Sequence, residues 1–335
     1  MIQYLYLGRV GYDEGLRLQA EIAGLVAEGR ARNVLLLLEH EPVLTLGRNA
    51  NRANILASNE ALKQRGVAVH EINRGGDVTY HGPGQLVGYP IFDLRTLRGP
   101  SGGRMGPVDF VRGMEEALIR LCGGFGVRAG RIAGLTGVWC GVAPEEHPSG
   151  AKAPVDFGAH AARLKSCPDT MRGRNEVFSQ PVKPVPFAEQ SFSSGSESLA
   201  IGESLSGQKR HAGAERKICA IGIHVSRGIT SHGFAFNVTT DLRDFALIIP
   251  CGIADHGVTS LALEAEEPEK LPAMEAIANE TARQFGLVFG ESVLAMESME
   301  ALRAAPAQFP AEDTPLQVPA EVERLHGGAE RPIRV

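Results

Sequence analysis

The chain has no long hydrophobic segment, since none of its 335 residues lie in a run that approaches about 18 consecutive apolar residues. Its N-terminus, MIQYLYLGRVGYDEGL, has neither a basic segment nor a long apolar run, so we expect no signal peptide and no membrane span. Five cysteines, an odd number without any CxxC pair, argue against a disulfide framework and against a zinc site. We predict a soluble cytoplasmic protein with reduced thiols and no metal.

The chain also lacks an excess of positive charge. Its 34 lysines and arginines are outnumbered by 39 aspartates and glutamates, which gives a net charge of -5. No lysine-rich run and no basic-aromatic pattern is present, so we expect no nucleic acid partner. A composition of 43% hydrophobic and 22% charged residues is ordinary for a globular protein and provides enough apolar residues for a sizeable core.

Glycine, in contrast, is concentrated in one stretch, RGGDVTYHGPGQLVGYP, which runs from Arg74 to Pro90. Its glycines permit positive φ and close approach of a ligand to the backbone, and Pro83 favours a turn between two short strands. Arg74 and His81 bracket this turn. Backbone amides beside a cation and an imidazole suit an anion, an oxyanion or a polarised carbonyl. The alternative is a glycine-rich hairpin with a purely structural role.

The string RGGxxTYHGPGQLVGYP resembles the signature of the lipoate-pathway octanoyltransferases. Two later stretches, KICAIGIHVSRGITSHGFAFNVTTDL and IIPCGIADHGVTSL, extend the resemblance over Tyr4 to Gly290 apart from one interruption. The resemblance implies a biotin and lipoate protein ligase-like fold and no cofactor. It also implies transfer of an octanoyl or lipoyl group from acyl carrier protein to a lysine of lipoyl domains, those of 2-oxoacid dehydrogenase complexes and of the glycine cleavage H protein.

Hydrophobic periodicity predicts an α+β sandwich, with helices packed on a mixed, largely antiparallel sheet. The predicted helices are Asp13–Gly29, Glu60–Arg65, Pro107–Gly123 and Leu271–Phe285. The predicted strands are Val34–Leu38, Val43–Leu46, Val67–Ile72, Val78–Tyr80, Gln85–Val87, Thr136–Cys140, Lys217–Val225 and His232–Val238. We expect Val34–Leu38 and Val43–Leu46 to form a hairpin-like pair.

The interruption, residues 141–216, changes composition. Glycine, proline and serine make up 25 of its 76 residues, and no hydrophobic period is sustained, so we predict a disordered insertion. The proline-containing tail, 305–335, is also predicted to be disordered. Residues 1–140 and 217–300 would then form a single catalytic domain.

A thioester transfer needs a nucleophile and a group that generates it. Cys251 lies between Pro250 and Gly252, where a thiol can project from a strand end into a cleft. Only about 3% of a thiol with the ordinary pKa is ionised at neutral pH, and a neighbouring ammonium increases that fraction. The resemblance implies that Lys217 and Cys251 form such a dyad. Cys219 is a rival nucleophile, because strand alternation places it on the same face as Lys217.

The resemblance also implies where the acyl chain binds, at three segments rich in small residues. These positions are Arg74, Gly75, Gly76, Asp77, Val78, Thr79, Tyr80, His81, Ala220, Ile221, Gly222, Gly233, Phe234 and Ala235. His81, His224 and His232 are candidates for polar contacts with the reacting carbonyl. Arg48, Arg52 and Arg74 form a candidate basic patch for acidic carrier domains.

Three alternatives remain. An ATP-dependent lipoate or biotin protein ligase of the same fold would need no cysteine nucleophile, so Cys251 favours the transferase. A non-catalytic acyl-carrier-binding module would leave Cys251 and Lys217 inert. A papain-like protease is the least supported, because no cysteine lies in a QxxGxCW-like context.

Overall fold

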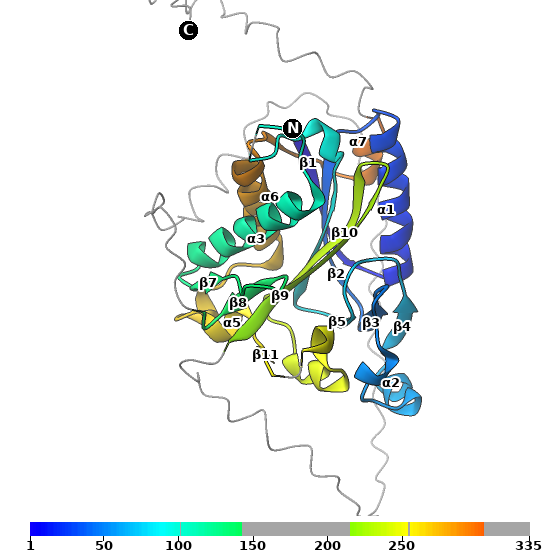
Figure 1. The fold of residues 1–335 in the computed structure, drawn as a ribbon, viewed down its shortest axis with the longest axis vertical. Coiled ribbons are helices and arrows are strands. Elements are labelled where there is room, and N and C mark those ends of the chain that lie inside the picture. The colour runs from blue at the N-terminus through cyan, green and yellow to red at the C-terminus, as the bar shows by residue number, and fades with distance from the viewer. Residues whose placement is uncertain (101, 143–214, 254, 305–335) are drawn as a thin grey trace, which may run out of the picture.

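The computed structural model describes residues 1–100, 102–142, 215–253 and 255–304 (Figure 1). Apart from its ends, the predicted insertion at 141–216 lies outside these ranges, as does the predicted tail at 305–335. Within the described ranges, no helix combines the length and the apolarity that crossing a membrane requires.

The main sheet has nine strands, in the order β12-β1-β2-β6-β10-β9-β8-β7, with β11 paired to β9. Its members are β1 (Ile2–Val10), β2 (Asn33–His40), β6 (Gln85–Ile91), β7 (Ala129–Gly130), β8 (Val138–Cys140), β9 (Arg216–Ser226), β10 (Ile229–Asn237), β11 (Gly257–Val258) and β12 (Val293–Ala295). The pairs from β2 through β6, β10, β9 and β8 to β7 are antiparallel, whereas β1 pairs in parallel with β2 and β12. The predicted mixed, largely antiparallel sheet is confirmed.

A second sheet has three strands, in the order β4-β3-β5. They are β3 (Val43–Leu46), β4 (Ala68–Glu71) and β5 (Val78–His81). The predicted hairpin of β2 with β3 is therefore wrong. Both edges of β2 are occupied by β1 and β6. Pro42, which cannot donate a ladder hydrogen bond, separates the two strands and the chain crosses to the other sheet.

Helices cover both faces of the main sheet (Figure 1). They are α1 (Tyr12–Ala27), α2 (Asn59–Gln64), α3 (Pro107–Gly124), α5 (Leu261–Glu264), α6 (Met274–Phe289) and α7 (Met299–Ala304). On one face α3 and α6 enclose an aromatic core with Phe92, Phe110 and Phe285. On the other, α1 and α7 pack against β2 and β6 through aliphatic residues. The four predicted helices are all present.

The pairing of β8 with β9 contains a β-bulge that matters for the site. Val138 is opposite Cys219, but Trp139 is opposite Lys217, so the register shifts within two residues. A bulge breaks the alternation of side chains between the faces of a strand. Cys219 lies in the core under α3 and α6, whereas Lys217 lines a cavity on the other side of the sheet. The expectation that the two residues share a face is wrong for this reason.

Candidate active site

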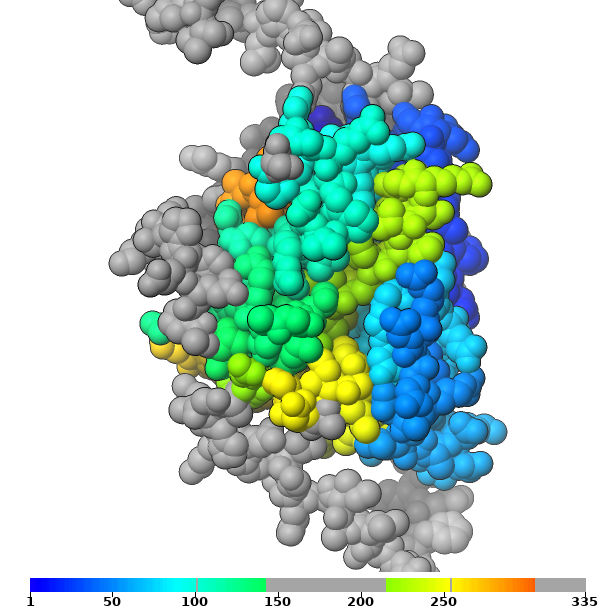
Figure 2. Space-filling view, in the orientation of Figure 1, coloured from blue at the N-terminus to red at the C-terminus, as the bar shows by residue number. Residues whose placement is uncertain are grey.

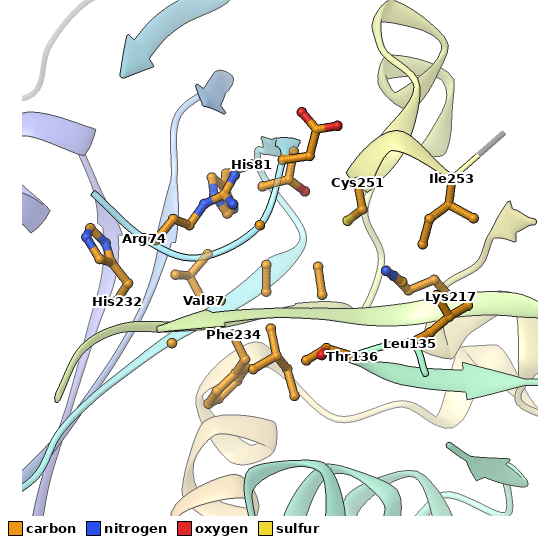
Figure 3. Close-up of a pocket in the computed structure, with 18 of the residues that line it drawn as sticks. Arg74, His81, Val87, Leu135, Thr136, Lys217, His232, Phe234, Cys251 and Ile253 are labelled. Atoms are coloured by element: carbon orange, nitrogen blue, oxygen red, sulfur yellow. The ribbon is translucent and has the colours of Figure 1, made fainter. Parts of the chain in front are cut away.

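A cavity of about 200 Å³ lies over β9 and β10, beneath the glycine-rich segment that leads into β5 (Figure 3). It gathers residues from segments that are far apart in the sequence. The predicted residues that line it are Arg74, Gly76, Asp77, Thr79, His81, Lys217, Ala220, Ile221, Gly222, His232, Gly233, Phe234, Ala235 and Cys251. The structure thus brings the predicted dyad and most of the predicted acyl-binding positions to one cavity.

Three predicted binding residues do not line the cavity. Val78 and Tyr80 alternate with Thr79 and His81 along β5, and they point into the core of the smaller sheet. The Tyr80 hydroxyl donates a hydrogen bond to Asp244, with an O···O distance of 2.7 Å. The Gly75 amide donates to the carbonyl of Ile223 at 3.1 Å, which holds the glycine-rich segment against β9.

The cavity also has walls that the sequence analysis did not assign. They are Tyr12, Val87, Tyr89, Gly134, Leu135, Thr136 and Ile253. Gly134, Leu135 and Thr136 belong to the loop before β8. The Gly137 amide in that loop donates to the buried Glu115 carboxylate of α3 at 3.0 Å, which fixes the loop beside Lys217. Gly137, where a Cβ atom would lie 2.5 Å from the Cys219 carbonyl, is the local sign of this close approach in the sequence.

Cys251 has a left-handed backbone, with φ 57° and ψ 18°, in the short 3-10 turn Pro250–Gly252. This conformation costs a non-glycine residue about 1 kcal/mol or more, so the surrounding structure must hold it. The Ile249 amide donates to the carbonyl of Asn54 at 2.7 Å, which ties the turn to the loop after β3. Gly252 follows with φ 69°, and a Cβ atom there would lie 2.6 Å from the Asp77 carboxylate. A side chain at Gly252 would therefore be strained and would displace the Asp77 carboxylate.

Cys251 differs from the other described cysteines in its exposure. Cys122, Cys140 and Cys219 are buried, whereas Cys251 is partly exposed and faces the cavity. Burial raises the pKa of Cys140 to about 12 and raises the pKa of Cys219 and Cys122 well above the ordinary value. A thiol that stays protonated in an apolar core is a poor nucleophile. Cys219 is thereby disfavoured as the nucleophile.

Lys217 and Cys251 line the same end of the cavity, and the Lys217 amine points toward the Cys251 turn (Figure 3). The residue is only 7% exposed. Its Nζ lies 4.6 Å from the centroid of the Trp139 ring. The Thr259 amide donates to the Lys217 carbonyl at 2.9 Å, and β11 pairs Val258 with Lys217, so the segment after Cys251 returns alongside the lysine.

Arg74 is a buried cation whose guanidinium bonds to uncharged oxygen atoms. It donates to the carbonyl and hydroxyl of Thr45 at 2.8 and 2.9 Å and to the carbonyl of Gly75 at 2.9 Å. Its Nε is buried without a hydrogen-bond partner, and within the described ranges no carboxylate forms an ion pair with it. Burial lowers the pKa of Arg74, while the charge of a Cys251 thiolate opposes that shift. Arg74 therefore gives the cavity a positive potential.

The cavity's histidines are kept neutral by burial. Burial lowers the pKa of His81 to about 3 and that of His232 to about 4. His81 contacts Gln85 Oε1 at 2.8 Å and the Thr45 hydroxyl at 3.3 Å, and His232 contacts Asn73 Oδ1 at 2.7 Å. His224, the third candidate histidine, does not line the cavity. Such groups are suited to orienting neighbours rather than to carrying charge.

Comparisons with known proteins agree with this fold. Residues 11–285 match the family model of the lipoyl protein ligase A/B catalytic domain. The octanoyltransferase of Acidobacterium capsulatum is 48% identical over 300 residues, which cover 89% of this chain and 94% of that protein. That of Koribacter versatilis is 40% identical over 326 residues, 97% of each.

Among solved structures, a lipoate-protein ligase A bound with ATP has a similar fold, with a TM-score of 0.50 at 13% identity over 90% of this chain and 93% of that one. This likeness confirms the predicted biotin and lipoate protein ligase-like fold. With a family model that spans most of the chain and relatives of this identity, the chain belongs to the lipoyl protein ligase A/B catalytic domain family.

Proposed function

We propose that this chain is an acyltransferase that moves an octanoyl group from acyl carrier protein, through a thioester on Cys251, to a lysine of a lipoyl domain. Relatives named octanoyltransferase, which align with nearly all of the chain, support octanoyl transfer. The observation that carries the role of Cys251 is its place: it is partly exposed in a left-handed turn, and it faces the cavity that Lys217 lines.

In the first half-reaction, the Cys251 sulfur attacks the thioester carbonyl of the donor. The attacking group is the thiolate that forms when the thiol proton passes to Lys217, which is then an ammonium. The carbon–sulfur bond to the carrier breaks, and the departing thiolate receives that proton from Lys217. The positive potential from Arg74 favours both the attacking thiolate and the oxyanion of the tetrahedral intermediate.

In the second half-reaction, the neutral amine of the acceptor lysine attacks the Cys251 thioester. Lys217 accepts a proton from the attacking nitrogen, the amide bond forms, and Cys251 leaves as a thiol after taking that proton back. No nucleotide takes part in either step. The acceptors in this proposal are the lipoyl domains of 2-oxoacid dehydrogenase complexes and the glycine cleavage H protein.

The small side chains of the cavity suit a linear acyl tail. Ala220, Gly222 and Ala235 leave room above the sheet, while Val87 and Phe234 supply apolar contact (Figure 3). Burying an acyl chain contributes about 0.8 kcal/mol per methylene, so an octanoyl tail gains several kcal/mol from this cavity.

Mass spectrometry after mixing with octanoyl-acyl carrier protein tests the proposal. We expect one octanoyl group on Cys251, present in Cys219→Ala and lost in Cys251→Ala, and discharged when a lipoyl domain is added. Formation of an octanoyl-adenylate with Mg-ATP, without a cysteine adduct, would instead establish a ligase. Carrier binding without any adduct would establish a non-catalytic module.

A further inference from the structure

The Trp139 side chain contacts Lys217 and the segment that follows Cys251. The face of its indole is covered by the Lys217 ammonium, 4.6 Å from the ring centroid. The ring of His256, five residues after Cys251, packs against the same indole with a centroid distance of 5.2 Å and an interplanar angle of 67°. One side chain thus contacts both the lysine and the return segment of the cysteine turn.

The contact with Lys217 has the geometry of a cation–π interaction. A lysine ammonium within about 6 Å of an indole centroid is attracted by the negative face of the ring, and the attraction strengthens when water is excluded. Trp139 is 1% exposed and Lys217 is 7% exposed, so both partners are largely dry. Within the described residues, Lys217 forms no ion pair with a carboxylate, and the indole is the group that compensates its charge.

The backbone brings Trp139 and Lys217 together. The β-bulge places Trp139 directly opposite Lys217 across the β8–β9 pair. A Cβ atom at Gly137 would lie 2.5 Å from the Cys219 carbonyl and 3.5 Å from Lys217 Cε, so the glycine lets β8 approach closely enough for the contact. His256 in turn contacts Asp255 at 2.9 Å and Glu215 at 2.8 Å, and these two carboxylates hold its ring against the Trp139 indole.

Trp139 also carries a cost that a smaller aromatic residue would avoid. Its indole N–H is buried without a hydrogen-bond partner. A buried unpaired donor lowers stability, and phenylalanine has no such donor. Tryptophan does, however, have the strongest cation–π attraction of the aromatic residues. Tryptophan at position 139 is therefore explained by the attraction of its π-face for the Lys217 ammonium rather than by its N–H.

We propose that Trp139 is a positioning residue that holds the Lys217 ammonium beside Cys251 through a cation–π contact. The proposal rests on the proposed role of Lys217. A weaker π-face would let the ammonium move away from the thiol, so less thiolate would form at neutral pH and acyl transfer would slow.

The test uses the fact that the chain contains a single tryptophan. Replacement of tryptophan by mono-, di- and trifluorotryptophan in the full-length protein weakens only the π-face of residue 139, with little change in its volume. We expect octanoyl transfer to fall stepwise, by about tenfold for the most fluorinated ring. The pH profile of Cys251 alkylation should move to higher pH in the same order. Equal rates and profiles across the series would overturn the proposal.

Two further variants separate this role from core packing and from failure of the dyad. Trp139→Leu and Phe92→Leu both remove a buried ring, but Phe92 does not line the cavity. Both should lower the melting temperature, and only the first should move the alkylation profile; equal effects would make Trp139 a packing residue. Lys217→Met should shift Trp139 fluorescence and slow transfer. If Lys217→Met retains full transfer, the proposed role of Lys217 is wrong, and the positioning role of Trp139, which depends on it, is then wrong as well.

Discussion

The two ends of the cavity are built differently (Figure 3). The cysteine end, formed by Cys251, Lys217 and Ile253, is made from a strained turn and a strand bulge. The histidine end, formed by Arg74, His81 and His232, is held by side-chain hydrogen bonds inside the fold. Space-filling drawing shows the loops of the cysteine end at the surface (Figure 2). The difference places the proposed nucleophile and its lysine on backbone irregularities, while the histidine end contributes neutral rings and the positive potential of Arg74.

Removal of the nucleophile should have the largest effect at the cysteine end. Cys251→Ala should lower transfer by more than about 10³-fold, because no other described cysteine lines the cavity. Cys219→Ala is the matched control, a buried thiol whose loss should leave the rate within about twofold and cost on the order of 1 kcal/mol of stability. Single-turnover transfer from octanoyl-acyl carrier protein measures both. A rate loss in Cys219→Ala equal to that in Cys251→Ala would reverse the assignment.

Removal of the Lys217 amine should have the second largest effect on transfer. Lys217→Ala should slow transfer by about 10²-fold without unfolding the protein, since a proton carrier of this kind contributes that much. Cys251 alkylation should then need higher pH to reach the same rate. Lys63→Ala, at the end of α2 and outside the cavity lining, is the control and should behave as the unaltered protein. An unchanged alkylation profile in Lys217→Ala would show that the two residues do not act as a dyad, even if activity drops.

The loop before β8, beside Lys217, offers a matched pair of glycines. Both Gly134 and Gly137 have positive φ, 80° and 123°, but a Cβ atom meets nothing within 4 Å at Gly134 and meets the Cys219 carbonyl at 2.5 Å at Gly137. Gly134→Ala should cost about 1 kcal/mol through backbone strain alone. Gly137→Ala should cost at least about 1 kcal/mol more and also slow transfer, since β8 must move away from Lys217. Urea unfolding and transfer rates measure these effects, and equal losses would show that the close approach is unimportant.

The histidine end, together with His40, whose ring centroid lies 6.1 Å from that of His81, should make the stability of the protein depend on pH. Burial lowers the pKa of His40 and His232 to about 4 and of His81 to about 3, below the unfolded value of about 6.5. As the pH falls through 6.5 the unfolded chain binds these protons first, so stability is complete above that pH and is lost down to about pH 4. Each histidine should cost about 1.4 kcal/mol per pH unit in this window.

Urea titrations at pH 7.5, 6 and 5 measure this slope, and His40→Gln should reduce it by about one proton. The His40 ring donates from Nδ1 to the Val10 carbonyl at 2.7 Å and accepts at Nε2 from the Tyr89 hydroxyl at 2.6 Å, so it is held neutral in one tautomer. A slope that does not change in His40→Gln would mean that His40 titrates normally in the folded protein.

Local patterns predicted the four longest or best-bounded helices and most of the strands between Val34 and Val238, because aliphatic runs and helix-ending residues act over a few residues, but the nine-residue strand β1 was not predicted. The pairing of those elements was harder to predict from the sequence. Whether β3 pairs with β2 or starts a second sheet depends on which edges are already occupied. The bulge that separates Lys217 from Cys219 depends on Trp139 in a different strand. Alternation along β5 also indicates that Val78 and Tyr80 face away from Thr79 and His81, and the resemblance alone did not separate them.

The predicted basic patch separates into three different environments. Arg74 is buried and lines the cavity, whereas Arg52 is exposed and paired with the exposed Glu71. Arg48 is exposed, and the described residues include no carboxylate paired with it. Its amide donates to the Arg74 carbonyl at 3.0 Å, which places it on the loop that covers the glycine-rich segment. Arg48 is therefore the residue of the three at which carrier docking is most directly tested.

Charge reversal at Arg48 should therefore have the smallest effect. Because an exposed charge steers association but contributes little once the complex has formed, Arg48→Glu should raise the KM for octanoyl-acyl carrier protein a few-fold at low salt. The kcat should stay unchanged, and the difference should vanish near 0.5 M salt, where the Debye length is only about 4 Å. Arg30→Glu, which reverses an exposed arginine in the turn between α1 and β2, is the control and should leave the KM unchanged. If the KM in Arg48→Glu equals that of the control at low salt, carriers do not dock over this loop, and the search for their binding surface should move to the loops around Ile253.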